Sequence, residues 1–199
     1  MAVGVLGGAF NPPHIGHLVL AQEAAAQLGL NRVVLVPTGR APHKRIADDP
    51  GIGTRLELTR VAATENGLLE VSDYECVRAG EDSEASYTVR TLEHLSERGE
   101  DLCLLMGADV AAHLEEWHEP QRVLELARLG IASRPGTAID EAEATLDRLG
   151  AADRAEIVRM PELGVSSTRI RRRVAQGRPV RYLVTEGVLA MVEGEGLYR

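Results

Sequence analysis

Cysteine is scarce in this chain. The 199 residues include two cysteines, Cys76 and Cys103, which lie far apart and each within an apolar stretch. Disulfide scaffolds need several cysteine pairs, and zinc sites need cysteines at short, regular spacing. The cysteine content therefore argues against both kinds of site, and it fits a reducing, cytoplasmic setting.

Long apolar runs are also missing. A helix that spans a bilayer needs roughly 20 consecutive apolar residues, and no run in this chain approaches that length. The first residues, Met1 to Gly4, lead directly into a strand-like segment without a charged leader. With 44% hydrophobic and 26% charged residues, the composition predicts a soluble, unexported globular protein with no membrane partner.

Lysine occurs once, at Lys44, and the other 21 of the 22 basic residues are arginine. The net charge is -8 at pH 7. Proteins that bind long nucleic acids neutralise several phosphates with clustered basic residues. The acidic balance therefore argues against a nucleic-acid partner, whereas a small phosphorylated ligand needs only a few cations in one place.

Apolar runs typical of buried strands alternate with segments of helical spacing. Strands are predicted at residues 3–6, 33–36, 68–71, 102–106, 129–132 and 156–158. Helices are predicted at residues 18–28, 54–65, 88–98, 120–128, 138–149, 168–175 and 185–192. This alternation predicts an α/β fold with a doubly wound, mostly parallel sheet, helices on both faces and a small C-terminal helical segment. Since no linker or repeat divides the chain, we expect a single domain over residues 1–199.

The first loop to follow a predicted strand has features of a phosphate site. Ligands bind at the carboxyl ends of strands in such a sheet, and this loop begins with Gly7 and Gly8 and continues to His14, Gly16 and His17. The two glycines let a phosphate approach the backbone, and the next helix offers unpaired N–H groups. Two histidines in the first turn of that helix would point the same way and donate hydrogen bonds to phosphate oxygens.

Other interpretations of this loop fit less well. A zinc protease carries its second histidine four residues after the first, whereas His14 and His17 are three apart. The dinucleotide-binding pattern Gly-x-Gly-x-x-Gly requires a later glycine that this loop lacks. Both a zinc hydrolase and a nicotinamide-dependent dehydrogenase are therefore disfavoured, and a pair of solvated surface histidines remains the simplest alternative.

Two further segments are candidates for binding an anion. Residues 37–45, Pro-Thr-Gly-Arg-Ala-Pro-His-Lys-Arg, gather four basic or potentially basic side chains after a strand. Near the carboxyl end, Ser166, Ser167 and Thr168 precede a predicted helix, where their hydroxyls and the backbone N–H groups suit a helix cap or a phosphate. Arg171 lies about one turn further on and could reach the same anion. A solvated basic loop and a capped amphipathic helix are the alternatives.

Together these segments resemble a known family. The run Gly8-Ala9-Phe10-Asn11-Pro12-x-His14-x-Gly16-His17 and the distant Ser166-Ser167-Thr168-x-Ile170-Arg171 are similar to the paired signature of the nucleotidyltransferase superfamily, which includes class I aminoacyl-tRNA synthetases. Within it, the chain most resembles the bacterial nicotinate-nucleotide adenylyltransferases. Further matching pieces occur in order at residues 37–44, 86–92, 106–109, 117–118, 134–136 and 180–184. The chain departs from the family at Ala9, Asn11 and Val165, and the missing charge at Asn11 leaves a metal role for that position open.

The resemblance implies a Rossmann-like fold in one nucleotidyltransferase domain that moves the adenylyl group of ATP to nicotinate mononucleotide. The products would be nicotinate adenine dinucleotide and pyrophosphate, in NAD biosynthesis. Mg²⁺ is the implied cofactor, held by substrate phosphates rather than by protein ligands, and both substrates are small molecules. The sequence is also compatible with a homo-oligomer. Transfer to nicotinamide mononucleotide or phosphopantetheine, and a non-catalytic nucleotide-binding module, are the alternatives.

The resemblance also implies roles for individual residues, with the two signature segments meeting at a shared polyphosphate. Those implied for ATP binding are Gly7, Gly8, Ala9, Phe10, His14, His17, Gly107, Asp109, Ser166, Ser167, Thr168 and Arg171. Those implied for nicotinate mononucleotide are Lys44, Tyr87, Thr88, Trp117, His118 and Arg134. The implied catalytic residues are His14, His17, Lys44 and Arg171.

Three of these residues can be judged partly from their own surroundings. Trp117 is the only tryptophan and lies in the polar run Glu115 to Glu119, a setting that suits stacking on a ligand ring better than burial in a core. For Asp109, which follows a predicted strand, a helix cap is the alternative to a ribose contact. For Tyr87, the alternative is core packing.

Overall fold

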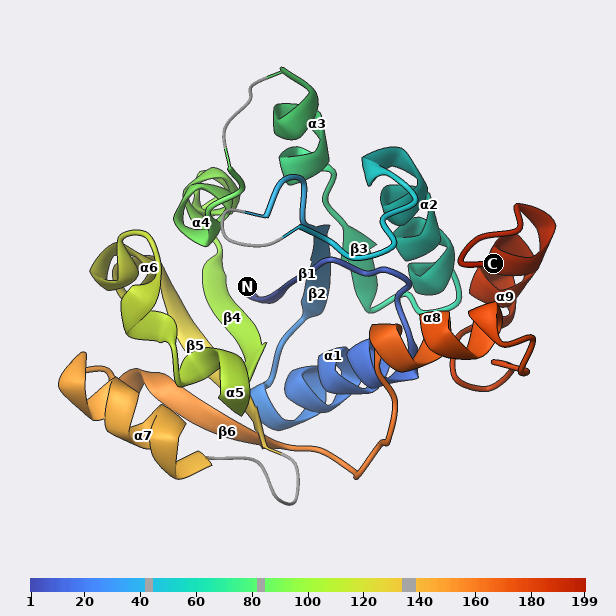
Figure 1. The fold of residues 1–199 in the computed structure, drawn as a ribbon. Coiled ribbons are helices and arrows are strands. Elements are labelled where there is room, and N and C mark those ends of the chain that lie inside the picture. Colours follow the sequence, from blue (N-terminus) through green and yellow to red (C-terminus); the bar gives the residue numbers. More distant parts are fainter. Residues whose placement is uncertain (42–44, 82–84, 134–138) are drawn as a thin grey trace. The chain divides into compact units, whose positions relative to one another are not determined.

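The computed structural model contains one six-stranded sheet (Figure 1), and it describes residues 1–41, 45–81, 85–133 and 139–199. The strands follow the order β3-β2-β1-β4-β5-β6, so that the direction of winding reverses between β1 and β4. Their bounds are β1 Ala2–Gly8, β2 Arg32–Pro37, β3 Leu69–Val71, β4 Asp101–Gly107, β5 Ala127–Ser133 and β6 Ala155–Arg159. All six predicted strands are confirmed.

The helices agree with the sequence except at a few places. Their bounds are α1 Ile15–Leu28, α2 Ile52–Ala63, α3 Tyr74–Glu81, α4 Thr88–Ser96, α5 Ala108–Ala111, α6 Pro120–Leu126, α7 Ile139–Arg148, α8 Ser167–Ala175 and α9 Glu186–Gly194, with 3-10 turns at Leu114–Glu116 and Ala152–Arg154. The predicted helix over 120–128 is too long, because Ala127 already pairs with Leu102 in the sheet. The helices α3 and α5 were not predicted. No helix among the described residues has both the length and the apolar character needed to cross a bilayer.

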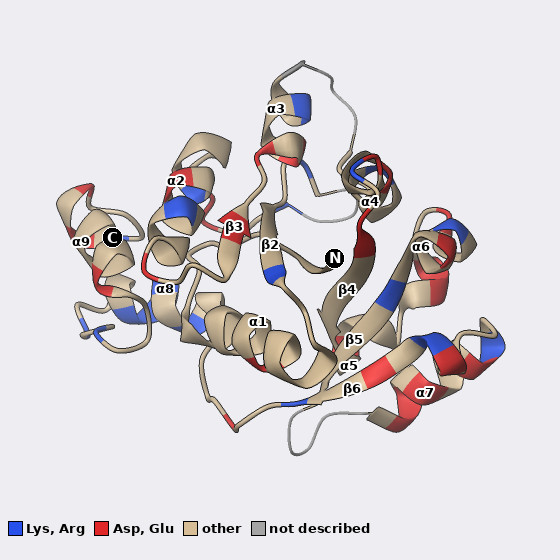
Figure 2. Cartoon of the chain, turned by 180° about the vertical axis from the view of Figure 1, so that it is seen from behind, with Lys and Arg blue, Asp and Glu red and all other residues tan. Residues whose placement is uncertain are grey.

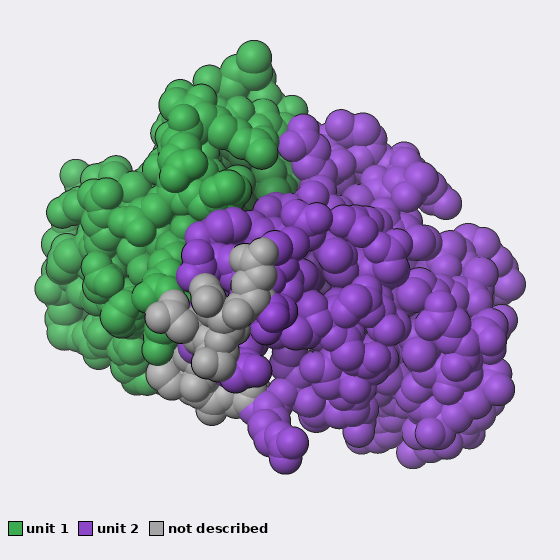
Figure 3. All heavy atoms as spheres, turned by 90° about the horizontal axis from the view of Figure 1, so that it is seen from above, with its two compact units in different colours: residues 1–7, 20–34, 87–162 green, residues 8–19, 35–86, 163–199 purple. Residues whose placement is uncertain are grey.

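The chain divides into two compact units (Figure 3). Unit 1 comprises residues 1–7, 20–34 and 87–162, and unit 2 comprises residues 8–19, 35–86 and 163–199. The expectation of a single domain over residues 1–199 stays a prediction.

Unit 1 is built around an apolar parallel sheet. In it, β4 pairs in parallel with both β1 and β5, and β5 pairs in parallel with β6. The strand β4 is buried from Leu102 to Met106 without alternation, as expected for a strand that is covered on both faces. A side chain at Gly130 would collide with Leu28 and Leu105, so this glycine lets α1 approach the sheet closely. The packing thus follows the uninterrupted apolar runs seen in the sequence.

Unit 2 has its own core, which holds the C-terminal helices. The helices α2 and α9 contact each other, and Gly187 leaves room for the side chain of Val61. The buried residues of this cluster are Leu58, Ala62, Val165, Ile170, Val180, Val184, Val188, Leu189 and Val192. Because Val165 and Ile170 belong to this core, the beginning of α8 is fixed from within. The loop before α1 is fixed from the same side, because the Ile15 N–H donates to the carbonyl of Leu183 at 3.0 Å.

Candidate active site

The turn after β1 is tightly constrained. Its β1 end is held by a hydrogen bond of 2.9 Å from the N–H of Thr38 to the carbonyl of Gly8. Phe10 is buried although its φ is 46°, which is a strained backbone conformation for a bulky side chain. A Cβ at Gly8 would lie 3.4 Å from the Phe10 ring. Strain of this kind is kept where surrounding contacts fix it, and it is typical of functional turns.

The two histidines of the first motif stack on each other. Their ring centroids are 3.8 Å apart with an interplanar angle of 21°, so the prediction that they point the same way is confirmed. The prediction that both lie in the first helical turn is wrong for His14, because α1 begins at Ile15. His14 precedes the helix, and its carbonyl accepts a hydrogen bond of 2.9 Å from the N–H of His17.

One hydrogen bond fixes the tautomer of the His17 ring. The backbone N–H of His14 donates to Nδ1 of His17 at 3.2 Å. Since Nδ1 accepts this bond, the proton of the His17 ring lies on Nε2, which is the donor that a phosphate oxygen requires. Gly16 supports this arrangement, because a Cβ there would lie 3.0 Å from the His14 ring and 3.1 Å from Val165.

The two signature segments meet, although about 160 residues separate them in the chain. The Ser167 hydroxyl donates to the carbonyl of Pro12 at 2.8 Å, and Nη1 of Arg171 donates to the carbonyl of Asn11 at 2.8 Å. Ser166 caps α8 as predicted, since its hydroxyl accepts from the N–H of Arg169 at 3.2 Å. The structure therefore joins the start of α8 directly to the turn after β1.

Arg171 is held by further contacts within unit 2. Its side chain is largely buried, and its Nε lies 3.1 Å from Oδ2 of Asp48. Its Nη2 lies 3.5 Å from the Thr168 hydroxyl. These contacts fix the guanidinium beside the turn and leave its remaining N–H capacity to be shared with a ligand.

Asn11 is a structural residue. It is 2% exposed. Its Nδ2 donates to the carbonyl of Ala47 at 2.7 Å, and its Oδ1 accepts from the Tyr198 hydroxyl at 2.7 Å. Burial raises the pKa of Tyr198 above its ordinary value, so this hydroxyl stays protonated and keeps donating. The Asn11 side chain thus fixes the turn between two distant segments. These contacts explain the place of Asn11 in the motif without a bound metal.

Arg55 was not predicted to matter, yet it joins the first two candidate loops. Its side chain is fully buried. Its Nη1 donates to the carbonyls of Ala9 at 3.0 Å and Thr38 at 2.7 Å, and Nη2 donates to the carbonyl of Gly39 at 3.3 Å. Its Nε pairs with Asp49 at 2.9 Å. No sequence pattern identifies Arg55 for this role, because its burial and its backbone partners depend on the folded path of the chain.

The second candidate loop is described only in part. Lys44 lies outside the described residues, and its predicted roles stay predictions. Arg40 is described, and it forms a reciprocal pair of hydrogen bonds with Ser86. Its N–H donates to the Ser86 hydroxyl at 3.0 Å, and its carbonyl accepts from the Ser86 N–H at 2.8 Å.

A second group of predicted residues lies in unit 1, at the carboxyl end of β4 and in the segments that follow it. Gly107 ends β4 and is the N-cap of α5, so the alternative of Asp109 as a helix cap is wrong. Asp109 lies in the first turn of α5 and is exposed. Its carboxylate occupies the space where a Cβ at position 107 would lie, which explains the glycine. An exposed carboxylate after a strand suits a sugar hydroxyl.

Aromatic rings gather at another point of unit 1. The rings of Tyr87 and His118 lie 4.3 Å apart at an angle of 32°. Thr88 begins α4 directly after Tyr87, and Trp117 is half-buried directly before His118. Tyr87 is not a core residue, since its side chain is partly exposed. The structure thus brings Tyr87 and His118 together, whereas Arg134 lies outside the described residues.

The thiols have no place in either group. Cys76 and Cys103 are free and buried. Burial raises the pKa of each thiol to about 11, which leaves very little reactive thiolate at neutral pH. The described residues also contain no group of three His, Cys, Asp or Glu side chains that could hold a metal ion.

A family model described as cytidylyltransferase-like matches residues 5–173. Among curated proteins, a "Probable nicotinate-nucleotide adenylyltransferase" of Roseiflexus sp. (strain RS-1) is 42% identical over 198 residues, which cover 99% of this chain and 98% of that protein. A protein of the same name from Desulfitobacterium hafniense (strain Y51) is 39% identical over 201 residues, covering 99% and 95%.

Solved structures agree on the fold. Plasmodium falciparum nicotinic acid mononucleotide adenylyltransferase complexed with NaAD superposes with a TM-score of 0.79 at 15% identity, covering 99% of this chain and 97% of that one. The same enzyme complexed with APC gives a TM-score of 0.76 at 14% identity, covering 99% and 96%. At these identities the likeness establishes the fold alone.

Proposed function

The chain belongs to the cytidylyltransferase-like family and, within it, to the nicotinate-nucleotide adenylyltransferases, and we propose that it transfers the adenylyl group of ATP to nicotinate mononucleotide. The products are nicotinate adenine dinucleotide and pyrophosphate, and the reaction belongs to NAD biosynthesis in the cytoplasm. The observation that carries this proposal is the pair of hydrogen bonds from Ser167 and Arg171 to the carbonyls of Pro12 and Asn11. These bonds bring the two signature segments together, which supports a shared role in binding phosphate.

The turn after β1 and the histidine pair act on the ATP phosphates. Backbone N–H groups of residues 7–10 and the N-terminal end of α1 face negative charge. The Nε2–H of His17 donates to a phosphate oxygen, and stacking against His14 holds the ring in place. Donors that are already oriented stabilise the charge that develops on the departing pyrophosphate at little reorganisation cost.

Arg171 and the start of α8 complete the proposed binding site for the polyphosphate. Arg171 is fixed by Asn11 and Asp48 before ATP arrives. A guanidinium that is already oriented lowers the barrier to a reaction between two anions, because such a reaction depends mainly on positioning and charge compensation.

The reaction needs no general base from the protein. The acceptor phosphate has a second pKa of about 6, so at neutral pH it is largely the dianion that attacks the α-phosphorus. One P–O bond forms to the acceptor as the bond to the pyrophosphate leaving group breaks. Mg²⁺ would be held by the phosphates of ATP and would neutralise part of their charge, since Asn11 is committed to protein contacts.

The acceptor base is the proposed partner of the aromatic group in unit 1. We assign the pyridine ring to Trp117, with Tyr87, Thr88 and His118 next to it, and a ribose hydroxyl of ATP to Asp109. Aromatic side chains contribute flat, partly solvated surfaces on which a ring can stack. The roles of Lys44 and Arg134 belong to the same proposal and rest on the family resemblance alone.

The direct test is an acceptor panel. The purified chain is incubated with Mg·ATP and nicotinate mononucleotide, nicotinamide mononucleotide or phosphopantetheine, and pyrophosphate and dinucleotide are measured. We expect turnover with nicotinate mononucleotide to exceed turnover with the other acceptors. Faster turnover with another acceptor would reassign the substrate. Tight ATP binding without product from any acceptor would replace the enzyme by a non-catalytic nucleotide-binding module.

A further inference from the structure

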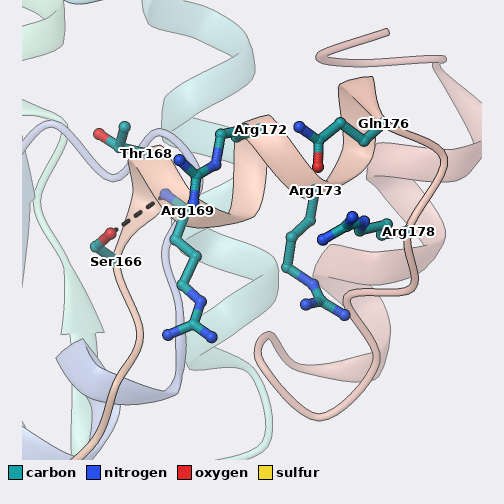
Figure 4. A pocket seen from close by; sticks show the side chains of 7 residues that line it. All are labelled: Ser166, Thr168, Arg169, Arg172, Arg173, Gln176 and Arg178. Atoms are coloured by element: carbon teal, nitrogen blue, oxygen red, sulfur yellow. Dashed lines mark hydrogen bonds between the residues drawn. The ribbon is translucent and has the colours of Figure 1, made fainter.

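The segment around α8 is rich in arginine and free of acidic residues. Between residues 163 and 185 there are six arginines and no Asp or Glu, in a chain whose net charge is -8. Four of them line a hollow of about 310 Å³ together with Ser166, Thr168 and Gln176 (Figure 4). The four are Arg169, Arg172, Arg173 and Arg178. None of the four is needed for the grip on ATP proposed above.

The charges of these arginines are not neutralised by described carboxylates. None of the four forms an ion pair within the described part of the chain, in contrast to Arg171, which pairs with Asp48. Arg169 is held by the carbonyl of Gly164 at 2.6 Å, and Arg173 by the carbonyl of Pro179 at 3.0 and 2.8 Å. These bonds orient the two guanidinium groups but leave several of their five N–H donors for another partner.

Arg172 and Arg178 are exposed, and their side chains make no hydrogen bond to the residues that the structure describes. Figure 4 shows Arg169 and Arg173 extending to the same side of α8, and the N–H of Arg178 donates to the carbonyl of Arg173 at 2.8 Å. The hollow thus combines two tethered and two uncommitted guanidinium groups.

Helix stability does not explain this arrangement. Like charges three and four positions apart on a helix repel each other, and Arg169 has such partners in Arg172 and Arg173. A cation in the last turn of a helix is favoured by the helix dipole, but a cation in the first turn is not. Arg172 and Arg173 lie in the last turn, whereas Arg169 lies near the N-terminal end. A bound anion would relieve the repulsion among all of them.

The hollow opens beside residues already assigned to ATP. Thr168 lines it, and the Thr168 hydroxyl lies 3.5 Å from Nη2 of Arg171. Arg171 in turn donates to the carbonyl of Asn11. We propose that the arginine hollow binds a diphosphate group, supplied either by free pyrophosphate or by the two terminal phosphates of a nucleoside triphosphate. The identification of pyrophosphate as the reaction product that reaches the hollow rests on the proposed function.

The size and charge of the hollow fit this ligand. Guanidinium groups bind phosphate oxygens through paired N–H donors, and four of them match the three to four negative charges of a diphosphate. The Ser166 and Thr168 hydroxyls add neutral donors at one end. A long nucleic acid is a poor match, because it would bring many more phosphates than the four arginines of the hollow can neutralise.

The test measures binding to the full chain without magnesium by isothermal titration calorimetry. The probes are sodium pyrophosphate and a non-hydrolysable ATP analogue. The double variant Arg172→Gln/Arg178→Gln removes the two uncommitted guanidinium groups, and Arg154→Gln/Arg159→Gln is the matched control. Both control positions are exposed, form no ion pair with described residues and lose the same charge.

The hollow variant should bind its ligand at least about tenfold more weakly, since one charge-assisted hydrogen bond is worth about that factor. If free pyrophosphate is the ligand, the unchanged chain still binds pyrophosphate when it is saturated with the analogue. The hollow variant then does not bind pyrophosphate under the same conditions. If nucleotide phosphates are the ligand, the analogue blocks pyrophosphate and itself binds the variant more weakly. The control should behave like the unchanged chain, and Arg172→Lys/Arg178→Lys should restore part of the affinity.

Equal binding of both probes to the hollow variant and the control would overturn the proposal, as would tighter binding of a single-stranded oligonucleotide than of pyrophosphate. The adenylyl-transfer assay is run separately. A chain that makes dinucleotide while the hollow variant binds normally removes this inference alone. A chain that makes no dinucleotide while the hollow variant loses pyrophosphate removes the proposed function alone.

Discussion

The two compact units bury different kinds of groups. Among the described residues, the buried polar and charged side chains of unit 2 are Asn11, His14, Arg55, Thr59 and Arg171, whereas those of unit 1 are Thr91 and Thr145. Unit 1 is held by an apolar sheet. Unit 2 combines its apolar core with a buried polar network. Loss of one partner in this network is costly, because it leaves a buried donor or acceptor unpaired.

Charge divides in the same way. Unit 1 contains 17 acidic and 9 basic residues, so it accounts for the entire net charge of -8, while unit 2 contains 13 of each. Figure 2 shows acidic residues gathered on α7 of unit 1. Apart from Gly7, the residues proposed to bind the ATP phosphates lie in unit 2. The net charge of a chain therefore says little about anion binding when the two signs are distributed unevenly.

The largest effect is expected from Arg55→Met in unit 2. The change leaves the carbonyls of Ala9, Thr38 and Gly39 without their donor and Asp49 without its cation. We expect the free energy of unfolding to fall by about 3–5 kcal/mol, the cost of breaking a buried ion pair and its network. Urea denaturation measures this change in the free energy of unfolding.

The matched change in unit 1 is Arg128→Met, which removes a partly exposed arginine paired with Glu156. It should cost about 1 kcal/mol or less. Equal losses for the two variants would contradict the contrast between the polar and the apolar unit.

His17→Ala should separate catalysis from stability. It removes an oriented phosphate donor, and loss of one such donor lowers turnover by about 100- to 1000-fold. Unfolding should change little compared with Arg55→Met. Steady-state rates at saturating ATP measure the effect, with His113→Ala, an exposed histidine of unit 1, as the control. Unchanged turnover in His17→Ala would remove this residue from the mechanism.

Tyr198→Phe tests a single contact of the polar network. Its hydroxyl donates to Oδ1 of Asn11 at 2.7 Å, and its loss should reduce the free energy of unfolding by about 1–2 kcal/mol and raise the KM for ATP. Tyr182→Phe is the control, since Tyr182 is 82% exposed. A Tyr198→Phe chain as stable as this control would show that Asn11 does not depend on the hydroxyl.

The same residue predicts a pH dependence. Burial raises the pKa of Tyr198 above its ordinary value of 10.0, so this group binds its proton more tightly in the folded chain. The stability it contributes is complete below about pH 10 and is lost as the pH rises further. Tyr198→Phe should lose less stability between pH 9 and pH 11, and parallel curves for the two chains would contradict the assignment.

The smallest effect is expected from Tyr87→Ala in unit 1. Loss of a ring that contacts His118 at 4.3 Å should raise the KM for nicotinate mononucleotide by about two- to tenfold, the usual worth of one aromatic contact. The KM for ATP should not change. A change confined to ATP would move the acceptor base away from this group, and Tyr182→Ala provides the comparison.

The strands could be predicted because a strand buried on both faces needs an uninterrupted apolar run, such as Leu102 to Met106. The short helix α5 could not, since four residues are too few to show a period. The end of α6 was misplaced because Ala127 and Arg128 fit either a helix or a strand, and pairing with β4 decides between them.

The candidate site was predictable where the chemistry lies in the residue types themselves. Glycines, histidines and hydroxyls in two segments identified phosphate-binding residues, and the contacts of Ser167 and Arg171 join those segments. The supporting residues were not predictable. Arg55 and Tyr198 act through backbone carbonyls or through one amide, and such partners depend on the folded path of the chain rather than on any local pattern.

The bond between Asn11 and Tyr198 spans 187 positions of the chain. A ribosome adds about 5–20 residues per second, so Tyr198 is added roughly 9 to 40 seconds after Asn11. During translation the carbonyl and amide of Asn11 must be satisfied by water or by a chaperone. Ribosomes stalled in the last helix should therefore carry a nascent chain in which β1 is complete but its turn is not yet fixed.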